Sequence, residues 1–134
     1  MADSKIPDDL RYAETHEWAR RDGDEATIGI SDYAQDELGD VVFLDLPWGG
    51  AGREIKAGQH FGDIESVKAT SELFSPVSGT IVRVNDALRD APEQVNTDPY
   101  GAGWMIVVRL SDPAELDKLM DAAEYKNFLD NATH

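Results

Sequence analysis

Short runs of β-branched and aromatic residues, separated by Gly, Pro, Asn and Asp, constrain this chain more than any other feature. Runs of this length suit strands better than helices, and the residues between them are typical of turns. The runs cover residues 18–20, 26–30, 41–46, 61–67, 73–84 and 104–110. The pattern therefore predicts a mainly β fold, built as a barrel or a sandwich of strands.

Two hairpins are predicted within this pattern. The segment Arg21-Asp22-Gly23-Asp24 lies between the first two runs, and an Asp-Gly pair in such a position is a strong hairpin signal. Polar residues 68–71 separate the runs 61–67 and 73–84, which predicts a second hairpin with Lys68 near its tip. Residues 85–103 contain Asn, Asp, Pro and Gly throughout, and we expect a long ordered loop there.

Helices are predicted at two places. Ser31 or Asp32 can cap a short helix that runs to about Leu38, with Gly39 at its C-terminal end. After residue 111, apolar residues recur at helical spacing, and capping signals begin at Asp112 and again at Asp121. We therefore expect one short internal helix and two C-terminal helices.

Size and charge narrow the classes of function. The 134 residues match one ordinary domain, so we expect a single domain over 1–134. The 27 Asp and Glu against 12 Lys and Arg give a net charge of −15, which disfavours binding to nucleic acid or to membrane surfaces. No apolar run approaches the roughly 20 residues of a membrane span. The acidic N-terminus resembles neither a signal nor a transit peptide, so we expect a cytoplasmic, bacterial protein.

The chain contains no cysteine. A disulfide framework, a thiolate metal site and a cysteine nucleophile are therefore excluded, and any sulfur redox chemistry must come from an attached cofactor. His16 and His60 are candidate metal ligands, but neither has a second His at i+3 or i+4. We therefore predict no metal site.

Lys68 is the candidate for covalent modification. It lies in Glu65-Ser66-Val67-Lys68-Ala69-Thr70, where two predicted strands reverse direction, so its amine should project into solvent. An acyl group on this amine would form a long flexible arm that reaches several active sites in turn. The spacing by itself also fits an ordinary surface lysine.

A series of ordered motifs runs nearly end to end through the chain. They include Thr15-His16-Glu17-Trp18, Leu38-Gly39-Asp40-Val41-Val42, Glu65-Ser66-Val67-Lys68-Ala69-Thr70-Ser71, Ser75-Pro76-Val77-Ser78-Gly79 and Asp98-Pro99-Tyr100-Gly101. In this order the motifs resemble the H-protein family of the glycine cleavage system. The resemblance implies a lipoyl-domain-like barrel-sandwich hybrid in which Lys68 carries lipoate as an amide. Glu65, Ser66, Val67 and Ala69 would form the attachment motif.

The resemblance implies a carrier that supplies no catalytic acid or base. A pyridoxal-phosphate glycine decarboxylase would load the aminomethyl group of glycine onto the lipoyl arm. A folate-dependent aminomethyltransferase would pass the carbon to tetrahydrofolate, and a flavin-containing dihydrolipoyl dehydrogenase would reoxidise the dithiol. A lipoate ligase or an octanoyltransferase would modify Lys68.

In this family the loaded arm can fold back into a pocket. The resemblance places Thr15, Glu17 and Glu72 there, although many members have Ser and Asp at the positions of Thr15 and Glu72. Tyr33 stands where some members have His, and a tyrosine can donate a hydrogen bond but cannot carry a positive charge. A carboxylate at Glu17 would favour a cationic amine and shield the loaded arm from water. By itself, Glu17 also fits an exposed strand charge.

Three other functions are compatible with parts of this pattern. A biotin acceptor usually has methionines beside its lysine, whereas Lys68 lies between Val67 and Ala69. A hydrolase that uses Glu17 with His16 or His60 is disfavoured, because adjacent strand residues point to opposite faces of a sheet. A lipoyl relay donor for other lipoate-dependent complexes would use the same lysine motif and remains open.

Overall fold

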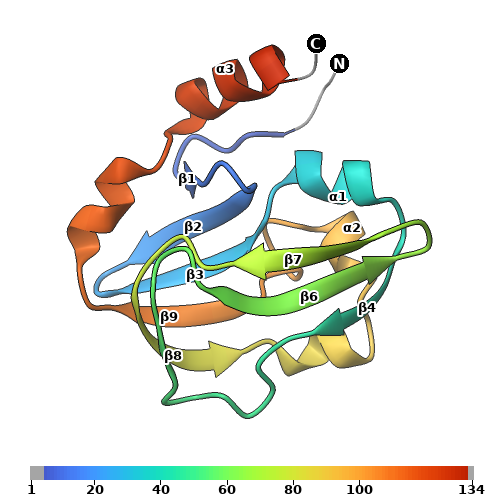
Figure 1. Ribbon diagram of the computed structural model, residues 1–134, viewed down its shortest axis with the longest axis horizontal. Helices are drawn as coiled ribbons and strands as arrows, with labels where there is room; N and C mark the ends of the chain where they lie inside the picture. The colour runs from blue at the N-terminus through green and yellow to red at the C-terminus, as the bar shows by residue number, and fades with distance from the viewer. Residues whose placement is uncertain (1–4, 133–134) are drawn as a thin grey trace.

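The structure, a computed structural model, describes residues 5–132 and consists mainly of two facing antiparallel sheets (Figure 1). The larger sheet has the order β1-β2-β3-β9-β8-β5, and the smaller one has the order β4-β6-β7. The strands of the larger sheet are β1 (Arg11–Tyr12), β2 (Glu17–Asp22), β3 (Glu25–Ile30), β5 (Glu54–Ile55), β8 (Gly79–Val84) and β9 (Ile106–Leu110). Those of the smaller sheet are β4 (Val41–Asp45), β6 (His60–Ser66) and β7 (Thr70–Phe74). The predicted sandwich of β-strands is confirmed.

The first predicted hairpin is formed by β2 and β3, and it is anchored by Trp18. This residue lies opposite Gly29 in the strand register and is fully buried. Its Nε1 donates to the carbonyl oxygens of Ile30 at 2.9 Å and Pro99 at 3.1 Å. A Cβ on Gly29 would lie only 2.7 Å from the indole ring, so glycine at this position makes room for the tryptophan. The hairpin is thereby fastened to the loop that follows residue 97.

Apolar side chains form two buried clusters. The main cluster lies between the sheets and includes Ile28, Leu44, Ile64, Leu73, Ile81 and Val108. The second cluster joins the N-terminal strands to helix α3 (Ala122–Ala132) and includes Leu10, Tyr12, Trp18, Tyr125 and Leu129. In it the rings of Tyr12 and Tyr125 stack at a centroid distance of 4.5 Å. Helix α3 therefore covers the end of the larger sheet near β1, as Figure 1 shows.

The internal helix is confirmed as α1 (Asp32–Leu38). The hydroxyl oxygen of Ser31 accepts from the backbone N–H of Ala34 at 3.2 Å, which caps the start of the helix. At its end, Gly39 has a φ of 79°, and its N–H donates to the carbonyl of Gln35 at 3.0 Å. The predicted cap residues are therefore correct.

The prediction that residues 85–103 are a loop is wrong in part. This segment contains the 3-10 helix η1 (Asp86–Arg89) and the short helix α2 (Gln94–Thr97). Each turn is held by one fully buried apolar side chain, Leu88 in η1 and Val95 in α2, and this burial depends on tertiary contacts. Of the two predicted C-terminal helices, the first is the 3-10 helix η2 (Pro113–Lys118) and the second is α3.

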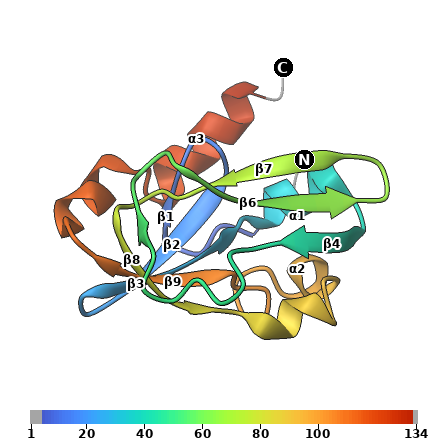
Figure 2. The same cartoon turned by 60° about the horizontal axis from the view of Figure 1, so that its bottom comes forward.

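The predicted strand over residues 73–84 is divided into β7 and β8 by residues 75–78. The hairpin of β6 and β7 crosses in front of the larger sheet, and its tip extends beyond α1 and β4 in both views (Figures 1 and 2). Within residues 5–132, no helix is long and apolar enough to cross a membrane.

Candidate functional site

Lys68 lies at the tip of the β6–β7 hairpin, as predicted, and is exposed. The turn is organised by Ser66, whose hydroxyl oxygen accepts from the backbone N–H of Ala69 at 3.1 Å and of Lys68 at 3.3 Å. The backbone N–H of Ser66 also donates to the carbonyl of Ala69 at 2.8 Å. Ser66 itself is buried, whereas Glu65, Val67 and Ala69 are exposed. The predicted attachment motif therefore contains one buried serine that organises the turn and an exposed lysine with exposed neighbours.

The stem of Lys68 lies along the C-terminal end of α1. Its Cε would be 3.5 Å from a Cβ placed on Gly39, and its Cδ would be 3.9 Å away. The tip is also tied to the chain after α1, because the N–H of Val67 donates to the carbonyl of Asp40 at 3.0 Å. The φ of 79° at position 39 favours glycine, whereas a Cβ there would meet the lysine stem only at ordinary van der Waals distance. The contact therefore places the stem of Lys68 beside the end of α1.

A cavity of about 270 Å³ adjoins the same end of α1, because Leu38 is one of its lining residues. It is lined by Thr15, His16, Glu17, Ile30, Tyr33, Ala34, Glu37, Leu38, Ile64, Ser71, Glu72 and Leu73. The four residues that the resemblance placed in the arm pocket, Thr15, Glu17, Tyr33 and Glu72, therefore line one cavity. Its walls come from the start of β2, from α1 and from β7.

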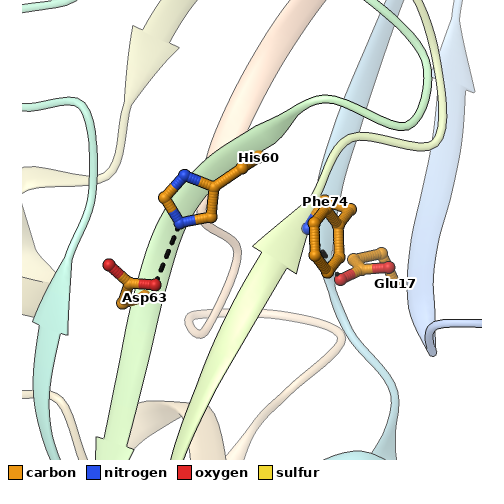
Figure 3. Close-up of polar contacts among 4 residues, drawn as sticks. All are labelled: Glu17, His60, Asp63 and Phe74. Carbon is orange, nitrogen blue, oxygen red and sulfur yellow. Dashed lines mark hydrogen bonds and ion pairs between the residues drawn. The ribbon is translucent and has the colours of Figure 1, made fainter.

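Glu17 is the buried charged group of the cavity, with 1% of its side chain exposed. Its carboxyl group accepts a hydrogen bond from the Thr15 hydroxyl. It accepts another from the backbone N–H of Phe74 at 3.0 Å, and Figure 3 shows Phe74 beside Glu17. Burial raises the pKa of Glu17 to about 7, although both hydrogen bonds act to lower it. The interpretation of Glu17 as an exposed strand charge is therefore wrong, because β7 packs against it.

His16 also lines the cavity, which the sequence argument did not anticipate. The expectation that residues 16 and 17 face opposite sides of a sheet does not apply, because His16 precedes β2 and has a φ of 80°. Its Nδ1 lies 2.8 Å from the hydroxyl of Tyr125, and that hydroxyl lies 2.7 Å from Oγ of Ser31. Burial lowers the pKa of His16. Helix α3 thus holds the segment that carries Thr15 and Glu17 in place.

Glu72 faces both the cavity and a cluster of polar groups on the surface of the smaller sheet. It lies opposite Asp63 in the β6–β7 register, and one potential metal-ligating atom from each of Glu72, Asp63 and His60 lies within 4.8 Å of the others. Nε2 of His60 lies 2.9 Å from Oδ1 of Asp63 (Figure 3), and this hydrogen bond raises the pKa of His60. The sequence has no second histidine at helical spacing from His60, so this group was not predicted. Its third member, Glu72, comes from the neighbouring strand β7.

Sequence reasoning also missed several other lining residues, namely Ser71, Glu37, Ala34 and Leu38. Ser71 and Glu72 follow the lysine motif in the sequence. This closeness to Lys68 and to the predicted pocket residue Glu72 could have indicated that Ser71 lines the cavity. Glu37 and Leu38 are ordinary helix residues, and nothing in the local sequence distinguishes their pocket-facing positions.

The fold and the site define the class of protein, a lipoyl-domain-like carrier fold with an exposed lysine at a hairpin tip and a polar cavity beside it. The family described as "Glycine cleavage H-protein" matches residues 10–132. The chain therefore belongs to the glycine cleavage H-protein family, which provides the lipoate-bearing carrier of the glycine cleavage system.

Similar proteins agree over nearly the whole length. A glycine cleavage system H protein of Anaeromyxobacter sp. (strain K) is 55% identical over 126 residues, which cover 94% of this chain and 97% of that protein. One of Myxococcus xanthus (strain DK1622) is 52% identical over 132 residues, with 98% and 100% covered. The crystal structure of a glycine cleavage system H protein from Mycobacterium marinum matches with a TM-score of 0.82 and 40% identity, over 91% of this chain and 97% of that one.

Proposed function

We propose that Lys68 carries lipoate as an amide and that the loaded arm docks in the cavity lined by Glu17. The observation that carries this proposal is the position of Lys68, exposed at a tip organised by Ser66, with its stem beside Gly39 at the end of α1. The cavity is large enough for a small polar group, and it offers one buried carboxylate. These features fit a flexible acyl arm that ends in a cationic cargo.

The residues of the chain bind and position, and we propose that none of them acts as a catalytic acid or base. The attached lipoate would supply the dithiolane that accepts the aminomethyl group of glycine. Glu17, held by Thr15 and the N–H of Phe74, would accept a hydrogen bond from the cationic amine. Tyr33 and Glu72 would border the same space, while the buried side chains of Ile30, Ile64 and Leu73 would cover one part of it from water.

The proposed partners follow from membership of the glycine cleavage system. They are the pyridoxal-phosphate glycine decarboxylase, the tetrahydrofolate-dependent aminomethyltransferase and the FAD-containing dihydrolipoyl dehydrogenase, with a lipoate ligase or an octanoyltransferase that modifies Lys68. The cytoplasmic, bacterial location stays a prediction, which cell fractionation would test. We also propose that no metal resides at His60, Asp63 and Glu72, because their side chains are partly or fully exposed and already interact with one another.

The direct test is in vitro lipoylation. Purified chain is incubated with lipoate, ATP and a lipoate ligase, and intact mass and peptide mapping then locate the adduct. We expect one lipoyl group, located on Lys68. The variant Lys68→Arg should remain unmodified, while Lys56→Arg, at another exposed lysine, should be modified normally. An adduct that persists in Lys68→Arg, or modification by biotin in place of lipoate, would contradict the proposal.

A further inference from the structure

An exposed apolar surface lies beside Lys68. In the part of the chain that the structure describes, the large hydrophobic side chains that are exposed are Val42 at 49%, Phe43 at 55% and Val67 at 69%. Val42 and Phe43 belong to β4, and Val67 precedes the lysine at the hairpin tip. We call these three residues the β4 patch. A cluster of exposed apolar groups on so acidic a protein is typical of an interaction surface.

The β4 patch is assembled by an irregularity in the smaller sheet. Among the strands that the structure describes, β4 is an edge strand whose one partner is β6, and the register shifts between Val41 and Phe43. Consecutive residues of a regular strand point to opposite faces, but this shift leaves both Val42 and Phe43 exposed. The hydrogen bond from the N–H of Val67 to the carbonyl of Asp40 holds the tip against the start of β4. Figures 1 and 2 both show β4 alongside the end of β6 that leads into the tip.

Carboxylates surround the β4 patch. Asp40 precedes the strand, Asp45 ends it and Glu65 lies opposite Phe43 in the register, and all three are exposed. A complementary surface would present an apolar recess with a rim of Lys and Arg side chains. This charge pattern disfavours a second copy of the chain, which has the same acidic rim and a net charge of −15.

We propose that the β4 patch is the docking surface for the enzyme that acylates Lys68. This inference rests on the proposed function, because it assumes that Lys68 receives the lipoyl group. The acylating enzyme must bring Nζ itself into its active site, and Val67 adjoins that lysine in the chain. The enzymes that act on the dithiolane meet the far end of a long arm and can do so without covering β4.

The reaction at this surface is amide formation with an activated lipoyl group, here lipoyl adenylate made from lipoate and ATP. Nζ of Lys68 forms a bond to the lipoyl carbonyl carbon. The bond from that carbon to the phosphate oxygen breaks and AMP leaves, while the proton lost from the amine passes to a base or to solvent. The β4 patch takes no part in this chemistry and contributes binding alone, so its loss should raise KM and leave kcat unchanged.

The test compares lipoylation kinetics of the unmodified full-length chain and its variants. The double variant Val42→Thr with Phe43→Thr removes apolar surface and keeps β-forming residues. Val82→Thr, a partly exposed site on β8 of the other sheet, is the matched control. We expect the double variant to raise KM of the ligase for the protein about ten-fold, because two apolar anchors that are buried together in an interface can contribute about that much. Equal melting temperatures of the variants and wild type would show that the fold is retained.

A second measurement separates this inference from the proposed function. After prolonged incubation with ligase has lipoylated all variants completely, the rate at which dihydrolipoyl dehydrogenase acts on the arm should be the same in each. Unchanged KM in the double variant would overturn the docking surface while leaving lipoylation of Lys68 standing. Equal losses in lipoylation and in the dehydrogenase reaction would also overturn it. A dimeric wild type and a monomeric double variant with the same KM would assign the β4 patch to self-association, and this result would overturn it as well. Failure of wild type to become lipoylated would instead refute the proposed function.

Discussion

Glu17 should make docking of the loaded arm depend on pH. In the empty protein, burial raises the pKa of this carboxyl to about 7, so near neutral pH a substantial fraction of it is protonated. A cationic amine in the cavity stabilises the ionised form, and docking therefore lowers this pKa and releases a proton. It follows that docking strengthens as the pH rises through about 7. The variant Glu17→Gln keeps the shape of the side chain and cannot ionise.

The size of the effect follows from one buried interaction. Loss of a hydrogen bond between a carboxylate and a cationic amine costs about 1–3 kcal/mol. Such a loss weakens docking by roughly 5- to 150-fold, since 1.36 kcal/mol corresponds to a factor of ten. The burial of Glu17 favours the upper part of this range.

The assay follows ammonia release from loaded protein without the aminomethyltransferase. Lipoylated wild type and Glu17→Gln are loaded with the aminomethyl group, and release is then measured at several pH values on both sides of about 7. We expect faster release from the variant, and the ratio of variant to wild-type rate should increase with pH. Hydrolysis of the aminomethyl linkage in water also depends on pH, and this dependence cancels when the variant rate is divided by the wild-type rate at the same pH.

The control is Glu37→Gln, which changes an exposed carboxylate that lines the same cavity. It should release ammonia at close to the wild-type rate. Equal release rates for wild type and Glu17→Gln at every pH, with normal lipoylation and normal melting temperatures, would refute the reasoning. A ratio that stays constant with pH would refute the part that depends on ionisation of Glu17.

Four further predictions concern stability and organisation. Because the pKa of Glu17 is raised on folding, the free energy of unfolding of empty wild type should fall as the pH rises from about 4.5 to about 7, and urea titrations should show a smaller fall in Glu17→Gln. Gly29→Ala brings a Cβ to 2.7 Å from the ring of Trp18 and should destabilise the protein by about 1–3 kcal/mol, measured by thermal unfolding. Tyr125→Phe removes the hydroxyl that contacts His16 and Ser31 and should cost about 1–3 kcal/mol in urea denaturation, whereas an unchanged midpoint would mean that water replaces this hydroxyl. If residues 1–134 form one domain, calorimetry should record one cooperative transition, and two separate transitions would contradict this.

Much of the fold could be predicted because its signals are local. The Asp-Gly turn before β3, the cap at Ser31 and the reversal at Lys68 each depend on a few neighbouring residues. Turn propensity and side-chain capping act over such short distances, so the sequence indicates these features without knowledge of the packing. The resemblance then placed Thr15, Glu17, Tyr33 and Glu72 together, and the structure brings all four to one cavity.

The properties of the site were decided by contacts between distant parts of the chain. Glu17 has a raised pKa because β7 packs against it. The backbone donor that this strand supplies to Glu17 is Phe74, which is 57 residues away in the sequence. The two turns within residues 85–103 form because Leu88 and Val95 are buried by other elements. The amino-acid sequence by itself thus determined most of the strands, the main turns and the position of Lys68 at a hairpin tip, since these depend on local propensity. Burial and charge state depend on which surfaces meet, and only the tertiary structure decides that.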